Sequence, residues 1–186
     1  MISKGLDFPN VTLVIVINGD ASLNIPDFRS AERTFSLLNQ VAGRSGRGQL
    51  AGEVIIQGYN IDHYSIICAS NNDYLSFYNQ EMSIRRVLKY PPFYNLSLIK
   101  IKGNDANICL VEANKIAKYL KDNANNEIIL GPSASAMPKI NNTYYFQIIV
   151  KYKKINSLIK HLEFINNKYL LNSKVAVEID INPIKI

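Results

Sequence analysis

The sequence has few residues of the types that bind metal ions, and they are far apart. Cys68 and Cys109 are separated by 41 positions, and the only histidines are His63 and His161. Structural zinc sites take about four cysteine or histidine ligands, usually in close pairs, so this spacing excludes such a site. We expect both cysteines to be buried free thiols, because a reducing compartment does not favour a disulfide.

Long hydrophobic runs are also missing. The longest, at 12–17 and 146–150, are far shorter than the roughly 18 to 20 residues of a membrane span. The segment 1–10 has no apolar stretch followed by a small-residue cleavage site, as a secretory signal would. With 47% hydrophobic and 19% charged residues in a chain of 186, we expect one or two globular domains in a cytoplasmic protein that binds no membrane.

Acidic residues are too few to balance the lysines of the second half. Residues 1–92 hold eight Lys or Arg and eight Asp or Glu, whereas residues 93–186 hold thirteen Lys and seven acidic residues. The whole net charge of +6 therefore lies in the second half, which contains no arginine. An excess of this kind favours binding to nucleic acid.

The first half has the pattern of a parallel α/β fold. The continuous apolar run at 11–17 predicts a buried strand, the spacing over 30–42 predicts a helix, and 52–58 predicts a second strand. Asp27 and Ser30 are candidate caps of that helix, and Gly43 can end it. Because two strands are too few for a stable sheet covered on both faces, we expect part of the sheet to be missing and apolar surface to be exposed.

The rest of the chain predicts a different arrangement. Helices over 62–69 and 73–89 lead to Pro91 and Pro92, which stop the second helix. The order that follows is β-α-β-β-α-β, which is typical of a ferredoxin-like domain of the α+β class. Its predicted elements are a strand over 93–102, a helix over 105–122, strands over 127–131 and 143–152, a helix over 155–171 and a strand over 174–181.

The most informative segment is QVAGRSGRG at 40–48, at the end of the first helix. It places Arg44 and Arg47 three residues apart, each beside a glycine. Two planar guanidinium groups held in this way suit a polyphosphate, where an arginine finger stabilises charge on the γ-phosphate. Alternatively, they are solvated charges that oppose the dipole at the helix end. These residues alone leave both interpretations open.

A second segment, KGLDFP at 4–9, precedes the first apolar strand. Together the two segments resemble motifs V and VI of superfamily 2 helicases. The block DFRSAERTFSLLNQVAGRSGR at 27–47 narrows the resemblance to the primosomal protein N′ (PriA) family of replication-restart helicases. The resemblance covers essentially the whole chain, because it continues through EMSIRRVLKYPPF (81–93), LGPSASAMPK (130–139), YYFQIIVKYK (144–153) and VEIDINP (177–183).

This resemblance implies a 3′ to 5′ DNA helicase driven by ATP with Mg²⁺, which has two RecA-like lobes, a zinc-binding insertion and a C-terminal domain. Residues 1–68 then form the C-terminal part of the second RecA-like lobe, 69–92 a helical connector and 93–186 the C-terminal domain. Catalytic roles fall on Arg44 and Arg47, which resemble the arginines that reach the γ-phosphate, and on Gln40 in the same motif. The residues implied to line the path of nucleotide and DNA are Lys4, Gly5, Asp7 and Gly43.

Other family motifs are absent. The sequence has no GxxxxGK[ST] phosphate loop, no DExH box for Mg²⁺ and no cysteine series for zinc. The chain therefore resembles only the last part of the family. We expect it to show no ATPase or unwinding activity by itself, because nothing would hold ATP for the arginines.

The lysines of the second half, with several tyrosines nearby, fit contact with single-stranded DNA. Alternatively, the lysines cover a solvated surface and the aromatic side chains of 143–152 belong to the core. The family's C-terminal domain is associated with forked or single-stranded DNA, with the acidic tail of single-stranded DNA-binding protein and with other primosome proteins. Lys139 and Gln147 match positions for that tail, although Thr143 and Tyr145 stand where relatives commonly carry arginine.

Two further interpretations stay open. The chain can be a non-catalytic module, left by truncation, that binds DNA or single-stranded DNA-binding protein. It can also bind RNA through the ferredoxin-like domain, but only the predicted fold favours this.

Overall fold

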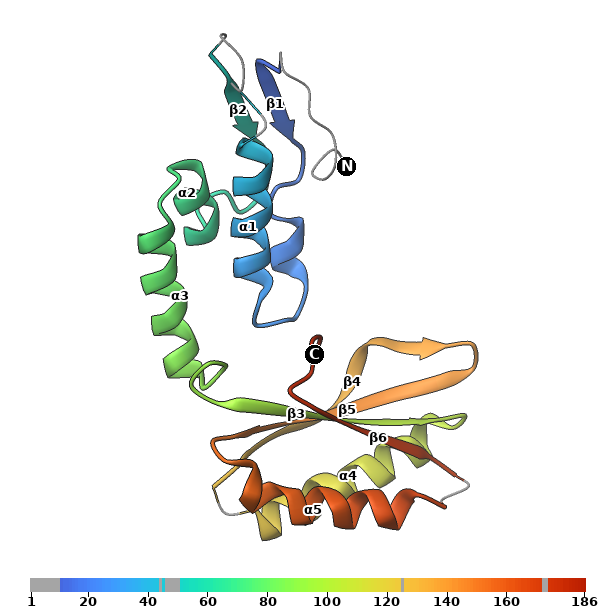
Figure 1. The fold of residues 1–186 in the computed structure, drawn as a ribbon. Coiled ribbons are helices and arrows are strands. Elements are labelled where there is room, and N and C mark those ends of the chain that lie inside the picture. Colours follow the sequence, from blue (N-terminus) through green and yellow to red (C-terminus); the bar gives the residue numbers. More distant parts are fainter. Residues whose placement is uncertain (1–10, 44, 46–50, 125, 172–173) are drawn as a thin grey trace. The chain divides into compact units, whose positions relative to one another are not determined.

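A computed structural model describes residues 11–43, 45, 51–124, 126–171 and 174–186 (Figure 1). The chain divides into two compact units, Met1–Val87 and Leu88–Ile186, which are described separately below. Both units mix helices and strands, and the two sheets differ in type: one is parallel and the other antiparallel. The fold is therefore mixed α/β, in agreement with the alternating patterns of the sequence.

The first unit contains a two-stranded parallel sheet, in which Val14 pairs with Val54. Helix α1 packs against this sheet, and its Phe35 and Leu38 form a core with residues of α2 and α3. The rings of Phe35 and Phe77 are stacked, with centroids 4.1 Å apart. The elements of this unit are β1 (Leu13–Val16), the 3-10 helix η1 (Ala21–Asn24), α1 (Ser30–Ala42), β2 (Glu53–Ile56), α2 (Tyr64–Ser70) and α3 (Tyr74–Leu88).

Helix α1 has the predicted range, but its N-cap differs from the sequence-based prediction. The N-cap is Arg29, which makes no side-chain capping bond, so neither Asp27 nor Ser30 caps the helix. Asp27 accepts from the Arg29 backbone N–H at 2.9 Å, while the Ser30 hydroxyl donates to carbonyl oxygens of the preceding turn. Gly43 does follow the helix, but its φ of −65° is not the left-handed conformation that favours glycine.

Apolar side chains of the parallel sheet are exposed, as the sequence predicts. Leu13, Ile15, Ile17 and Ile55 are 48%, 56%, 76% and 45% exposed. Within the described residues, β1 and β2 pair only with each other. Among the described residues, the parallel sheet therefore has two strands and leaves apolar side chains uncovered.

The second unit is a four-stranded antiparallel sheet with two helices on one face (Figure 1). The strand order is β4-β5-β3-β6, so β5 and β3 form the central pair and β4 and β6 are the edge strands. Ile99 and Ile101 of β3 and Ile148 of β5 are fully buried in the core shared with the helices. The elements are β3 (Asn95–Gly103), α4 (Ala106–Asn123), β4 (Ile128–Ile140), β5 (Thr143–Tyr152), α5 (Ile155–Tyr169) and β6 (Ala176–Ile181).

Strand β4 is longer than predicted, because it continues from 131 to Ile140. A two-residue turn, Asn141-Asn142, joins it to β5, and both asparagines have positive φ angles of 46° and 61°. Turns of this type match the twist of antiparallel strands, and asparagine tolerates them well. The pairing shifts register twice, between Leu130 and Ser133 and again further along, which breaks the alternation that would have revealed the strand.

Both cysteines are buried free thiols, as predicted. Within the described part of the chain, no cluster of three or more His, Cys, Asp or Glu residues could hold a metal ion. No described helix is both long and apolar enough to cross a bilayer.

Candidate nucleotide and nucleic-acid sites

The two segments that resemble helicase motifs each lead into one of the parallel strands. Segment 4–9 precedes β1, and 40–48 precedes β2. The Ser45 hydroxyl donates to the carbonyl oxygens of Glu53, at 3.1 Å, and of Thr12, at 3.5 Å. Ser45, which lies between the two predicted arginines, is thus beside the start of both strands. The described residues next to the two motifs therefore meet at the N-terminal ends of the two parallel strands.

Two of the predicted nucleotide-site residues are described. Gln40 is exposed in the last turn of α1. Gly43 follows this turn, and its N–H donates to the Asn39 carbonyl oxygen at 3.0 Å. The structure therefore brings these two residues together at the end of α1 that leads towards Ser45. The other predicted residues lie outside the described part of the chain: Lys4, Gly5, Asp7, Arg44 and Arg47.

Asp20 lies at the other end of the parallel strands, after β1, and binds the segment that follows β2. It was not among the predicted site residues. Its carboxylate is buried, and Oδ2 accepts from the backbone N–H groups of Tyr59 at 3.0 Å and Asn60 at 2.8 Å. Oδ1 has no hydrogen-bond partner among the described residues and lies against Gly58, where a Cβ would come within 2.8 Å of it. Asp20 thus ties together the segments that follow β1 and β2. The polar triplet at 18–20, directly after an apolar strand, is the signal that could have indicated it.

An ionic network joins α1 to α3. Arg85 is buried, and it forms ion pairs of 2.6 Å with Glu81 and 2.7 Å with Glu32. The hydroxyl of Tyr64 donates to the other oxygen of Glu81. Burial and this carboxylate together raise the pKa of Tyr64, so the phenol stays protonated. Two blocks that carry the family resemblance, 27–47 and 81–93, are therefore joined by a structural network.

The two predicted partner-binding residues of the second unit lie at separate places on the β4–β5 hairpin. Lys139 is exposed and pairs in register with Tyr144, whose ring centroid is 4.9 Å from the lysine Nζ. Gln147 is half-buried on β5 and pairs in register with Lys100 and Ser133. The two side chains therefore occupy different register positions of the hairpin, and the structure does not bring them together.

A buried lysine, which the sequence analysis also did not select, holds the start of the second unit. Lys151 is only 5% exposed; its Nζ donates to the Leu88 carbonyl oxygen at 2.8 Å and lies 3.5 Å from the Tyr90 ring centroid. Burial, and to a lesser extent the nearby charge of Lys89, lower the pKa of Lys151. No periodicity could have predicted this position, because Lys is rarely buried.

These features define a class of protein: a mixed α/β chain in which a parallel sheet, with two strands among the described residues, is followed by a separate antiparallel unit rich in lysine. The match to a family model, "Primosomal protein N C-terminal domain", covers residues 86–184, and the chain belongs to this family. The second unit and the last residues of α3 provide most of the match.

Curated relatives match almost the whole chain. The replication restart protein PriA of Bacillus subtilis is 46% identical over 187 residues, which are 98% of this chain and 23% of the relative. The proteins of the same name from Chlamydia pneumoniae and Synechocystis are 38% and 37% identical, with 98% and 100% of this chain covered and 25% and 22% of theirs. The chain thus spans about a quarter of the length of these relatives, and it matches their C-terminal part.

Proposed function

We propose that this chain is the C-terminal part of an ATP-dependent 3′ to 5′ DNA helicase that restarts stalled replication forks and initiates primosome assembly. The observation that carries the proposal is the identity of 46% to a replication restart protein over nearly the entire chain. Identity at this level extends through both units, so it applies to the motif segments as well as to the second unit.

In this proposal the first unit is the end of a RecA-like lobe. The two parallel strands with α1 packed on them, and their exposed apolar side chains, support an incomplete sheet of this kind. Arg44 and Arg47 would contact the γ-phosphate of ATP, with Gln40 beside them. The position of Ser45, at the start of both strands, is consistent with a single site built from 4–9 and 40–48. The residues that bind the remaining phosphates and Mg²⁺ would come from outside this sequence.

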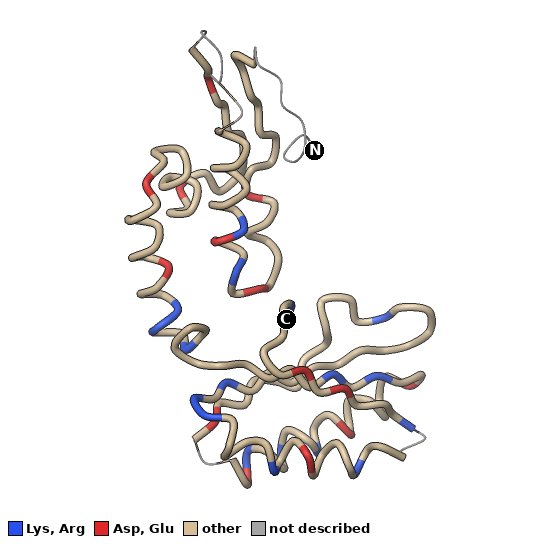
Figure 2. The backbone as a smooth tube through the Cα atoms, viewed as in Figure 1, with Lys and Arg blue, Asp and Glu red and all other residues tan. Residues whose placement is uncertain are grey.

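The second unit is, in the same proposal, a ferredoxin-like domain that binds DNA and primosome partners. Its element order and strand order support that fold, and its lysines supply the charge (Figure 2). Lys139 and Gln147 would contact single-stranded DNA-binding protein. The alternative, a non-catalytic binding module, is favoured by one observation: the second unit has a complete core of its own.

A chimaera distinguishes the proposed helicase function from the alternative of a non-catalytic binding module. This chain would replace the matching C-terminal part of the Bacillus subtilis relative, and DNA-dependent ATP hydrolysis would be measured. We expect activity, and we expect Arg47→Ala to lower kcat by a factor of about 10³ or more, as removal of an arginine finger does. Arg86→Ala, which removes an exposed arginine of the same unit from α3, serves as the control. An active chimaera that is insensitive to Arg47→Ala would contradict the assigned role, whereas a folded, DNA-binding but inactive chimaera would favour the non-catalytic module.

A further inference from the structure

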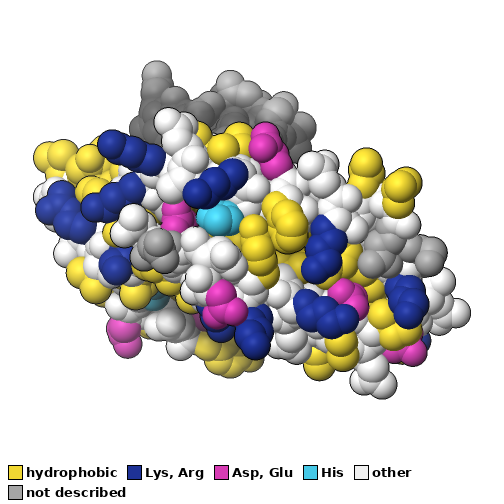
Figure 3. Space-filling view, turned by 90° about the horizontal axis from the view of Figure 1, so that it is seen from below, with side chains coloured by type: hydrophobic (Ala, Val, Ile, Leu, Met, Phe, Trp, Pro, Cys, Tyr) yellow, Lys and Arg dark blue, Asp and Glu magenta, His cyan; other side chains and the backbone are white. Residues whose placement is uncertain are grey.

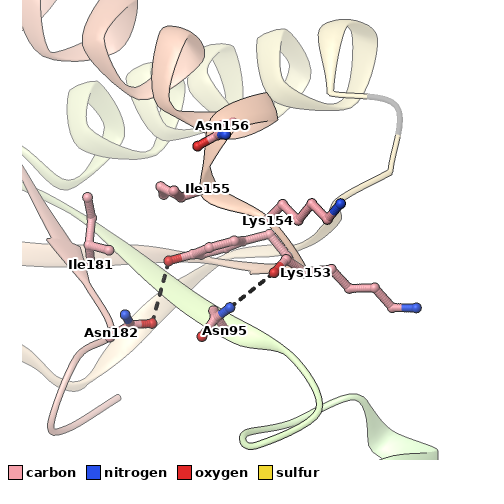
Figure 4. Close-up of a pocket in the computed structure, with 8 residues that line it drawn as sticks. Asn95, Lys153, Lys154, Ile155, Asn156, Ile181 and Asn182 are labelled. Atoms are coloured by element: carbon pink, nitrogen blue, oxygen red, sulfur yellow. Dashed lines mark hydrogen bonds between the residues drawn. The ribbon is translucent and has the colours of Figure 1, made fainter.

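A groove lies at the end of the antiparallel sheet where β5 leads into α5 (Figure 4). Its volume is about 460 Å³, within the range of pockets that hold small ligands. Three asparagines, two lysines, two isoleucines and Tyr152 line it, and none of its lining residues is acidic. The polar residues that matter below are Asn95, Asn156, Asn182, Lys153 and Lys154.

The groove has two chemically different ends. Lys153 and Lys154 extend in the same general direction, away from Ile181 and Asn182 (Figure 4). Asn182 is held in place, because its backbone N–H donates to Leu96 at 2.8 Å and its Oδ1 accepts from the Tyr152 hydroxyl at 3.5 Å. One end therefore offers positive charge, and the other offers a side-chain amide beside an apolar surface.

Positive charge is concentrated next to the groove. The Nζ atoms of Lys89 and Lys153 lie 5.9 and 5.4 Å from the ring centroid of Tyr94. The buried Lys151 is close enough to Lys89 to feel its charge. None of these lysines, nor Lys154, forms an ion pair with a carboxylate of the described residues. Burial, and next the like charge of Lys89, lower the pKa of Lys151.

The face covered by α4 and α5 differs in this respect. Figure 3 shows lysine side chains mixed there with acidic and apolar ones. Lys115 pairs with Glu112 at 2.7 Å, and the same glutamate accepts from the Tyr169 hydroxyl at 2.7 Å. Charge on the helix face is thus partly compensated, whereas charge at the groove is not.

We propose that the groove binds one nucleotide of a single-stranded DNA, with its phosphate at Lys153 and Lys154 and its base against Ile181 and Asn182. This inference deepens the proposed function and rests on it. The groove fits a nucleotide because an amide both donates and accepts hydrogen bonds, as base edges do. Lys89 and Lys153 beside Tyr94 continue the positive surface to the next phosphate. An acidic peptide could also engage the lysines, so the test below includes one.

The test measures fluorescence anisotropy of a labelled oligo(dA) of about twelve nucleotides, titrated with the full chain at salt concentrations between about 50 and 200 mM. The variant is Lys153→Gln/Lys154→Gln. Its matched control is Lys118→Gln/Lys160→Gln, which removes two exposed lysines from the outer faces of α4 and α5. We expect the groove variant to bind about tenfold more weakly and to reduce the salt slope by about 1.4, since each lost contact contributes about 0.7 on a single strand.

If both variants lose DNA affinity equally, the proposed site in the groove is contradicted, but DNA binding by the second unit still stands. A wild-type chain that binds no DNA at low salt would instead contradict the proposed function itself. Side-chain amide resonances of the three asparagines give a second readout that needs no variant. They should shift on addition of oligo(dA), and shifts caused by an acidic peptide but not by DNA would assign the groove to a protein partner.

Discussion

At the scale of single residues, Arg85 links two helices of the first unit through its ion pairs with Glu32 and Glu81. It is buried between two carboxylates, and Glu81 in turn accepts from Tyr64. A carboxylate that loses its buried cationic partner keeps the cost of desolvation without the attraction that offset it. Arg85 thus fixes α3 against α1 through charge as well as packing.

We therefore expect Arg85→Met to lower the free energy of unfolding of the first unit by about 3 kcal/mol, in the range for a broken buried ion pair. This loss of unfolding free energy can be measured by urea unfolding of the full chain, with hydrogen exchange of the α1 and α3 amides as the probe of the first unit. Asn79→Met, at an exposed position of the same helix, should cost less than about 1 kcal/mol. Equal effects of the two changes would mean that the network contributes no more than an exposed side chain does.

At the scale of elements, the β4–β5 hairpin depends on its two-residue turn. Asn141 and Asn142 both have positive φ, a conformation that costs a β-branched residue about 1 to 2 kcal/mol. We expect Asn142→Val to destabilise the second unit by about this amount and Asn142→Gly to leave its stability unchanged or higher. Thermal unfolding followed by circular dichroism checks both, and a valine variant as stable as the glycine variant would refute the argument.

Elements with a regular period were predictable from the sequence, whereas details set by tertiary contacts were not. Helix α1 and strand β5 begin and end where their patterns predict. The extension of β4 was missed because its pairing shifts register and its residues are mostly exposed. Asp20 and Lys151 were missed because their roles come from partners far along the chain. The predicted roles of Arg44 and Arg47 came from family resemblance, and they stay predictions because these residues lie outside the described part.

At the scale of the whole molecule, the two units differ in how completely they bury their apolar residues. The antiparallel unit encloses a core between its sheet and two helices. The parallel unit leaves Leu13, Ile15 and Ile17 exposed along one short strand and its extension. Exposed apolar surface beside an unpaired strand edge favours association.

The purified chain should therefore self-associate through the parallel sheet. We expect Ile15→Lys/Ile17→Lys to shift it towards monomer in light scattering without lowering the unfolding midpoint of the second unit. Val111→Lys, at a position of α4 that is 51% exposed, is the control and should not change the association state. Association that persists in the double variant, or that disappears in the control, would place the contact elsewhere.

The contact between Asp20 and Gly58 has a consequence for how this sequence can vary. The carboxylate fills the space that any side chain at position 58 would need, and it bonds to the backbone of the next two residues. Position 58 can therefore accept a larger residue only if position 20 gives up its carboxylate, and that change releases the segment after β2. The residue at each of these two positions therefore limits which substitutions the other can accept.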